Sequence, residues 1–336
     1  MYIYGVLDSS KELFFGPHGV TACEEVYTVS YQDISLVVCD SQIVDYSFMS
    51  KPALAGLLVE HQKVIEKIMN LGHTIVPLRL GTFLNQDAEI ENVLSKSYSF
   101  LKDIVEKVKD KIEIDLAATW NDFNLALKEA GQEQEIKEIK ERLLANSKKV
   151  TVEEQMKVGL MVKKALDKRR EKYAEEIKDA LKTVSQDVKI HELMDDKMVA
   201  NCAVLIDKSK QKEFDQIVKD LNTKFAERLN FRSVGPLPAY SFYTLEIKKM
   251  QFEEVNWARK KLGLNEAATK EEITKAHKLK ALSTHPDRNS NMPDRENKFD
   301  EVTKAYEALL DYCQEHSCSF REEDFRKNSL IVKVRQ

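Results

Sequence analysis

The chain has 336 residues, 43% of them hydrophobic and 32% charged, which is enough for two or three folded domains of ordinary size. Its formal net charge of −4 gives no support for a nucleic-acid-binding protein, since such proteins carry a basic excess. No apolar run approaches the roughly 20 residues that cross a bilayer, and the first residues lack the basic and apolar regions of a signal peptide. We therefore expect a cytoplasmic protein whose partners are neither nucleic acid nor membrane.

Residues 1–120 are predicted to form a compact α+β domain. Short apolar and aromatic runs indicate strands, and apolar residues that recur every three to four positions indicate helices. Pro77 lies inside a strand-like run and places it at a sheet edge or interrupts it, because proline has no backbone N–H to donate. His61 lies on the apolar face of a helix and is interpreted as a structural histidine. The strands are expected at 2–7, 26–30, 34–39, 74–83 and 111–120, and the helices at 52–72 and 88–108.

Residues 121–197 differ in composition, because they are dense in lysine and glutamate and contain no proline. Apolar residues keep helical spacing here, which predicts two or three long helices that form a charged helical arm. Residues 198–250 are predicted to form a second α+β domain. Its strands are expected at 199–206, 231–234 and 240–247, and its helix at 212–228.

Residues 256–312 are predicted to be helical throughout and are followed by a polar tail at 313–336. Thr269 and Glu272 have the spacing of a capping box at the start of the second helix. The tripeptide His285-Pro286-Asp287 follows that helix and is expected at the tip of an antiparallel helical hairpin. Three helices are expected at 257–264, 270–284 and 294–312, a short tail strand at 330–332, and Ile273, Ala276, Leu279 and Leu282 on the inward face of the second helix.

Several segments of the first 250 residues resemble, in the same order, the GvpF/GvpL family of gas vesicle proteins. They are the run Tyr2 to Val6, the segment Val76 to Thr82, the strand ending at Trp120-Asn121-Asp122, and the string Gly235-Pro236-Leu237-Pro238-Ala239-Tyr240-Ser241-Phe242. Leu80 and Leu237 depart from the family, which has Phe and Trp there. The resemblance implies an α+β fold of two ferredoxin-like domains linked by long helices. It also implies an accessory role in gas vesicle assembly, with the gas vesicle shell protein and other gas vesicle accessory proteins as partners.

The segment around His285-Pro286-Asp287 resembles the J domain of DnaJ/Hsp40 co-chaperones, which implies an Hsp70 as a partner. The resemblance assigns Hsp70 contacts to His285, Pro286, Asp287, Lys275 and Lys278. The chain departs from the usual J-domain sequence in two places. Leu279 and Lys280 stand in the reverse of the usual order, and Ser283-Thr284 replaces Lys-Tyr. Both a J domain that couples to Hsp70 and a J-like hairpin kept for docking fit this pattern.

A partner that binds unassembled shell protein needs an edge strand or an apolar groove, because such a shell protein exposes apolar surface before assembly. Tyr2, Tyr4 and the strand at 75–84 are candidates for the edge. The alternative is that these aromatic residues belong to the core. The full set of candidate partner-binding residues is Tyr2, Tyr4, Pro77, Arg79, Gly235, Pro236 and Tyr240.

No catalytic residue, cofactor or metal is expected. The five cysteines form no recognisable framework, which predicts reduced thiols. Cys313, His316 and Cys318 are too few and too loosely spaced for a zinc site. No glycine-rich phosphate loop occurs, and no constellation favours an enzyme. The absence of such motifs predicts a non-enzymatic protein, and the two resemblances imply a gas-vesicle-associated assembly factor. The alternative is a general J-domain co-chaperone with many clients.

Overall fold

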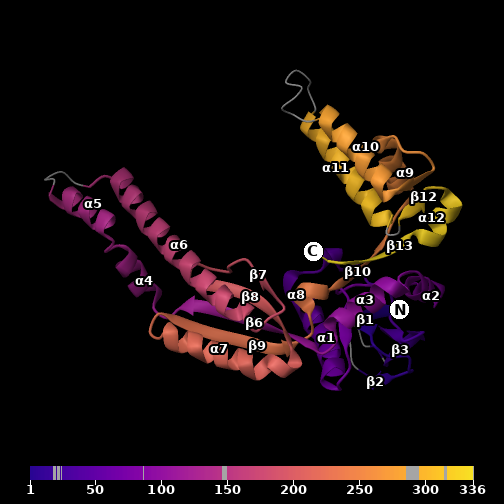
Figure 1. Cartoon of the computed structure of the whole chain (residues 1–336), viewed down its shortest axis with the longest axis horizontal. Helices are drawn as coiled ribbons and strands as arrows, with labels where there is room; N and C mark the ends of the chain where they lie inside the picture. Colours follow the sequence, from indigo (N-terminus) through magenta and orange to yellow (C-terminus); the bar gives the residue numbers. More distant parts are fainter. Residues whose placement is uncertain are drawn as a thin grey trace. The chain divides into compact units, whose positions relative to one another are not determined.

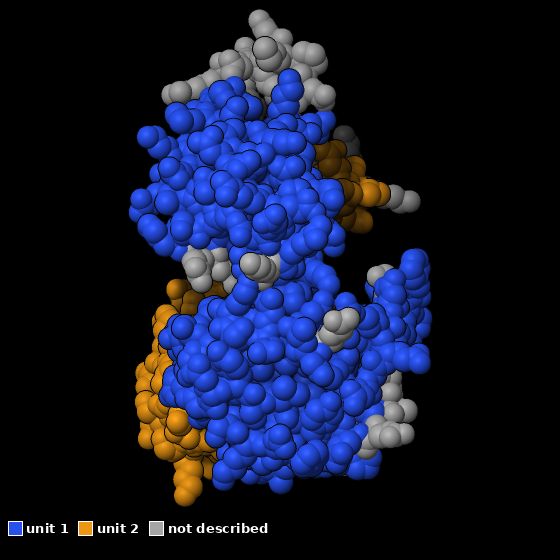
Figure 2. Space-filling model, turned by 90° about the vertical axis from the view of Figure 1, so that its right-hand side faces the viewer, with its two compact units in different colours: residues 1–107, 244–336 blue, residues 108–243 orange. Residues whose placement is uncertain are grey.

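The computed structural model describes the chain to residue 335 apart from residues 18–19, 21–22, 24, 86, 146–149, 285–294 and 314–315. The chain divides into two compact units, which Figure 2 shows in different colours. Unit 1 comprises residues 1–107 and 244–336, and unit 2 comprises residues 108–243. Both ends of the chain therefore belong to unit 1, and unit 2 is inserted between its two segments.

The first segment of unit 1 is built on a five-stranded sheet in the order β2-β3-β4-β1-β5. All six residues of β1 and of β4 are buried, which explains why apolar and aromatic residues dominate both strands. Ser50 caps the long helix α1, and proline lies in its first turn. The strands are β1 (Tyr2–Leu7), β2 (Phe14–Gly16), β3 (Val26–Tyr31), β4 (Ile34–Cys39) and β5 (Ile75–Pro77), and the helices are η1 (Tyr46–Phe48), α1 (Lys51–Asn70), α2 (Asp87–Lys96) and α3 (Tyr98–Val108).

Two expectations for this segment differ from the structure in extent. The strand expected at 74–83 ends at Pro77, and at Gly81 the backbone takes a φ of 84° beside the ring of Tyr46. A β-carbon at Gly81 would lie 2.7 Å from that ring, so glycine is required there for both reasons. The helix expected at 88–108 is divided at Ser97 into α2 and α3.

Unit 2 follows the β-α-β-β-α-β order of a ferredoxin-like domain, with its four strands in the order β7-β8-β6-β9. Every neighbouring pair is antiparallel. Figure 1 shows α4 and α5 lying along the long helix α6. The elements are β6 (Lys111–Trp120), α4 (Phe123–Ala130), α5 (Gln134–Ala145), α6 (Val152–Lys182), β7 (Asp187–Ile190), β8 (Met198–Asp207), η2 (Lys208–Lys210), α7 (Gln211–Lys224), β9 (Leu229–Leu237) and α8 (Tyr240–Tyr243).

The mixed α+β class is as predicted, but the division into domains differs in one respect. Strand 111–120 was expected to close the N-terminal domain, whereas β6 pairs with β8 and β9 at the centre of the second sheet. The helices expected as a separate arm also belong to unit 2, since α6 packs against β8. The ferredoxin-like order describes the sheet of unit 2, and the first sheet has a different strand order.

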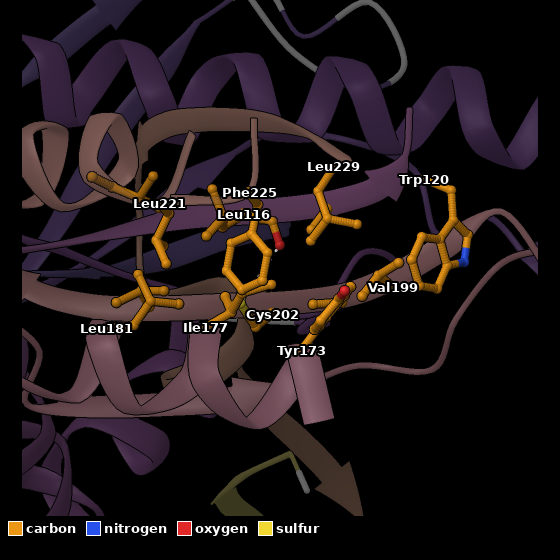
Figure 3. Close-up of a cluster of buried hydrophobic side chains, with 14 of the residues drawn as sticks. Leu116, Trp120, Tyr173, Ile177, Leu181, Val199, Cys202, Leu221, Phe225 and Leu229 are labelled. Atoms are coloured by element: carbon orange, nitrogen blue, oxygen red, sulfur yellow. Dashed lines mark hydrogen bonds between the residues drawn. The ribbon is translucent and has the colours of Figure 1, made fainter. Parts of the chain in front are cut away.

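The core of unit 2 lies between its sheet and the helices α6 and α7 (Figure 3). Tyr173 of α6 contacts the rings of Trp120 and Phe225, with ring centroids 5.7 and 5.0 Å apart. Ile177 and Leu181 continue this apolar face one and two turns further along α6. The regular apolar spacing in the sequence of α6 thus corresponds to the face that covers the sheet.

The second segment of unit 1 contains a helical domain held between two strands. The strand β10 enters it, and β13 leaves it and pairs antiparallel with β10 over five residue pairs. The short tail strand expected at 330–332 is confirmed as part of β13. The elements are β10 (Leu245–Lys249), α9 (Phe252–Leu262), β11 (Ala267–Thr269), α10 (Lys270–Thr284), α11 (Arg295–Tyr312), β12 (Ser317–Ser319), α12 (Glu322–Asn328) and β13 (Leu330–Val334).

The inward face of α10 differs from the one expected in the second half of the helix. Ile273 is fully buried and Ala276 packs against the core of the helical domain, as expected. His277 stacks on Tyr306 with 4.1 Å between ring centroids and Ala281 is partly buried, whereas Leu279 and Leu282 are exposed. Lys280 is exposed as well, so the exchanged order of Leu279 and Lys280 leaves both side chains on the surface.

The cysteines and the helices give two further findings. Cys23 and Cys39 are joined in a disulfide, so the expectation that all five cysteines are thiols is wrong for this pair. Cys202, Cys313 and Cys318 are not disulfide-bonded. Within the residues that the structure describes, none of the helices combines the length and the apolar character needed to cross a bilayer.

Candidate interaction surfaces

Hydrogen bonds through His61 of α1 link β1 to the residues that follow β5. The Nε2 atom of His61 lies 2.9 Å from the carbonyl oxygen of Leu78, which can only accept, so the imidazole N–H donates there. The Nδ1 atom then accepts from the hydroxyl of Tyr2 at 2.7 Å. Burial lowers the pKa of His61 to about 4, against the opposing effect of the bond to Leu78. His61 is therefore a neutral structural residue that fixes the segment after β5.

The aromatic residues of β1 belong to this buried network and not to a sheet edge. Tyr2 and Tyr4 have no exposed surface, and β1 lies between β4 and β5. The ring of Tyr4 stacks on His61, with 5.4 Å between centroids, and its hydroxyl accepts from the N–H of Val20. The edge expected at Tyr2 and Tyr4 is thus wrong, and the alternative of core residues is correct.

The strand β5 is an edge strand of the first sheet, as Pro77 predicted, and Pro77 itself is buried. The chain after it contacts the start of β10. The N–H of Arg79 donates to the carbonyl of Leu245 at 2.9 Å, and the Arg79 guanidinium contacts the carboxylate of Glu246 at 2.7 Å. Because the Arg79 side chain is half exposed, this ion pair contributes at most about 1 kcal/mol. Arg79 thus joins the two segments of unit 1.

Gly235 and Pro236 are exposed and lie in β9, which is one of the two edge strands of the sheet of unit 2. A β-carbon on Gly235 would lie 3.1 Å from the carbonyl oxygen of Glu113, so the glycine permits the close approach of β9 to β6. Pro236 has no N–H, so this edge strand carries one hydrogen-bond donor fewer, a feature that limits unwanted strand pairing. The exposed edge leaves β9 accessible to a partner.

Residues 240–243 cover a buried carboxyl group of β6. Glu113 is 1% exposed and accepts hydrogen bonds from the N–H and the hydroxyl of Ser241, at 2.8 and 2.7 Å. The Ser241 hydroxyl also lies 3.3 Å from Nε2 of His191, and Lys189 donates to the Ser241 carbonyl at 2.7 Å. Tyr240 is partly buried at the start of α8. The Tyr240-Ser241-Phe242 string therefore docks a short helix onto the sheet.

Burial raises the pKa of Glu113 to about 7, although the bonds from Ser241 oppose this shift. Because this pKa lies above the unfolded value near 4.5, the stabilisation is complete below that value and is lost as pH rises through about 7. We expect the wild-type unit 2 to lose roughly 1–3 kcal/mol between about pH 5 and about pH 8. Glu113→Gln is expected to reduce this dependence of the free energy of unfolding on pH, because glutamine does not ionise.

The measurement is urea unfolding followed by the fluorescence of Trp120 in a Trp257→Phe background, since Trp257 is half exposed and the chain has two tryptophans. Glu133→Gln, on the exposed surface of the same unit, is the matched control and should keep the wild-type slope. Equal slopes for wild type and Glu113→Gln would show that Glu113 does not titrate in this range.

The helix α10 carries an exposed basic row. Lys270, Lys275 and Lys278 line one open surface together with Glu271 and Thr274. Thr269 and Glu272 form the expected capping box, with each side chain bonded to the backbone N–H of the other residue. The candidate residues His285, Pro286 and Asp287 lie outside the described residues, directly after α10. Lys275 and Lys278 are thus brought together on one face of the helix that leads to the tripeptide.

Sequence reasoning missed Glu113, His191 and Glu246. Glu113 and Asp115 alternate with Ile112 and Ile114, which is the pattern of a strand with one solvated face. The buried carboxyl could not be told from a solvated one because its cover comes from residue 241, far along the chain. Among the residues that the structure describes, none of the His, Cys, Asp and Glu side chains gather in a group of three that could hold a metal ion.

Comparison with known proteins gives two separate matches along the chain. The model of a family described as gas vesicle synthesis protein GvpL/GvpF matches residues 1–244, and the DnaJ domain model matches residues 260–315. Gas vesicle protein F of Nostoc sp. is 26% identical over 225 residues, which cover 64% of this chain and 91% of that protein. Chaperone protein DnaJ of Salinibacter ruber is 50% identical over 50 residues, 15% of this chain and 13% of that protein.

Solved structures agree on the fold. The crystal structure of the gas vesicle protein GvpF from Anabaena sp. covers 72% of this chain and 97% of that chain, with a TM-score of 0.62 and 23% identity. That of GvpF from Microcystis aeruginosa gives a TM-score of 0.57 at 22% identity, with 72% and 98% covered. The family match spans well over half of the chain. The chain therefore belongs to the gas vesicle synthesis protein GvpL/GvpF family and carries a DnaJ domain after it.

Proposed function

We propose that this chain is a gas vesicle assembly factor that holds unassembled shell protein, other accessory proteins or both, and that uses its DnaJ domain to recruit an Hsp70. The observation that carries the proposal is the presence of both matches in one chain. Gas vesicle shell subunits need protection before they assemble, because exposed apolar surface promotes aggregation. An Hsp70 partner would supply the energy for their release. The protein needs no catalytic group for this role.

The basic face of α10 supports the Hsp70 part of the proposal. Lys275 and Lys278 lie one turn apart on an exposed surface and can meet an acidic patch on a partner. The same helix ends at Thr284, one residue before His285. A partner that contacts the lysines would therefore also lie close to the tripeptide.

The way in which the DnaJ domain is attached decides how it can be tested. Removing residues 256–336 would also remove β13, and β10 would lose its partner strand. Point substitutions leave this pairing intact and are therefore preferred. The assay is the single-turnover ATPase rate of an Hsp70 with the full chain. We expect stimulation by the wild type, none by His285→Gln, and a roughly tenfold loss for Lys275→Glu combined with Lys278→Glu.

The control for charge is Lys212→Glu in unit 2, which changes an exposed lysine far along the sequence from α10 and should leave the stimulation unchanged. If the wild type does not stimulate any Hsp70 of its own cell, or if His285→Gln stimulates equally, the recruitment proposal fails. A general co-chaperone remains the rival function. It predicts that the chain suppresses aggregation of unrelated proteins as well as that of the gas vesicle shell protein.

A further inference from the structure

The first half of α6 carries an apolar stripe for which the described residues provide no cover. Val152, Met156 and Leu160 follow each other at four-residue spacing and are 72%, 63% and 60% exposed. Residues four apart on a helix lie on one face, so these three side chains form a continuous row. We call Val152, Met156 and Leu160 the α6 stripe.

The α6 stripe is not needed for packing within unit 2. Val158, Met161 and Val162 are the side chains of this half of α6 that pack against the core of unit 2. At 100° per residue they lie on the side of the helix opposite to the α6 stripe. This half of α6 is therefore apolar on two sides, which is typical of a helix that contacts a partner on its second side.

The charges around the α6 stripe indicate which partner fits it. Glu153 lies beside its first residue and Lys163 lies three residues beyond its last. Both side chains are exposed, and neither forms an ion pair with a described residue. If two α6 helices meet antiparallel with Met156 of one opposite Leu160 of the other, then Glu153 lies opposite Lys163 at both ends. The charged positions at the two ends of this surface are thus complementary to each other.

Gly159 favours the same arrangement. It lies on the same face as Val152, two turns further on, and a β-carbon there would meet nothing within 4 Å. A glycine near the middle of the row lets a second helix approach closely. A parallel pairing would instead place Glu153 opposite Glu153 and Lys163 opposite Lys163, which is repulsive.

We propose that the α6 stripe is the contact surface of a homodimer in which two copies of this chain pair through antiparallel α6 helices. Three apolar side chains and their flanks bury far less than the roughly 800 Å² per partner of stable complexes. The dimer is therefore reversible and forms only at raised protein concentration. With the function proposed above, such a dimer carries two binding sites for gas vesicle proteins. The dimer proposal itself does not depend on which proteins those sites bind.

Sedimentation analysis of the full chain over a roughly hundredfold concentration range tests this proposal. We expect the mass to rise from monomer to dimer for the wild type and to stay at the monomer for Met156→Glu. Circular dichroism of Met156→Glu should match the wild type, because residue 156 is exposed in the monomer. A wild-type chain that remains a monomer throughout would overturn the proposal.

Charge reversal tests the antiparallel register. Glu153→Lys and Lys163→Glu should each weaken the dimer by roughly tenfold, because each replaces two attractive pairs with two repulsive ones. An equal mixture of the two variants should restore the wild-type affinity as a heterodimer, since both end pairs again have opposite charges. Lys172→Glu, at an exposed position of α6 about three turns beyond the α6 stripe, is the matched control and should leave dimerisation unchanged. Failure of the mixture to restore dimerisation would exclude this register.

Discussion

Replacing Phe225 with alanine is expected to lower the free energy of unfolding of unit 2 by about 3–5 kcal/mol. Phe225 is 4% exposed and packs edge-to-face on Tyr173, with ring centroids 5.0 Å apart. It also contacts Phe231 of β9, so its ring joins α6 to an edge strand of the sheet. Truncation would leave a cavity between three elements that cannot close without moving the sheet. Urea unfolding followed by Trp120 fluorescence measures the loss.

Ile190→Ala is the control for Phe225→Ala in the same unit. The side chain of Ile190 is 56% exposed on β7, so its removal should change the free energy of unfolding of unit 2 by less than about 1 kcal/mol. If Phe225→Ala cost no more than Ile190→Ala, the aromatic cluster of Figure 3 would not be the centre of the unit 2 core.

Val332→Asp is expected to open the β10–β13 pair and to cost about 3–5 kcal/mol. Val332 is 1% exposed and lies opposite Ile247, so a carboxylate there would be buried at a position that an apolar side chain now fills. The helical domain would then be attached to the chain by β10 alone. Hydrogen exchange of the β10 amides measures the effect, since these amides should lose protection together.

Arg335→Asp provides the comparison for Val332→Asp, because it adds the same side chain just beyond β13 at an exposed position. It should leave the exchange of β10 unchanged. Full protection of β10 in Val332→Asp would mean that β13 does not hold the helical domain.

The elements that the sequence predicted well are those whose signal is local. The apolar runs of β1 and β4 and the 3.6-residue spacing of α1 each contain all the information needed to recognise them. The capping box of Thr269 and Glu272 also spans four residues and was found in place. His61 could be recognised as structural because it lies within an apolar helical face.

The features that could not be predicted depend on contacts between distant residues. The sheet to which β6 belongs is set by its pairing with β8 and β9, up to about 120 residues away in sequence. The burial of Glu113 depends on Ser241, and the disulfide of Cys23 depends on the approach of β4. On α10, periodicity placed Ile273 and Ala276 correctly, but the inward face continues through His277 and Ala281 and leaves Leu279 and Leu282 exposed.

The central claim is a division of labour, in which residues 1–244 hold the gas vesicle proteins and the DnaJ domain acts on Hsp70. The most direct measurement compares wild type and His285→Gln in one assay, which follows capture of shell protein and its release by Hsp70 with ATP. We predict that His285→Gln captures shell protein as well as the wild type but releases none of it on addition of Hsp70 and ATP. Loss of capture in His285→Gln, or release equal to that of the wild type, would contradict the account.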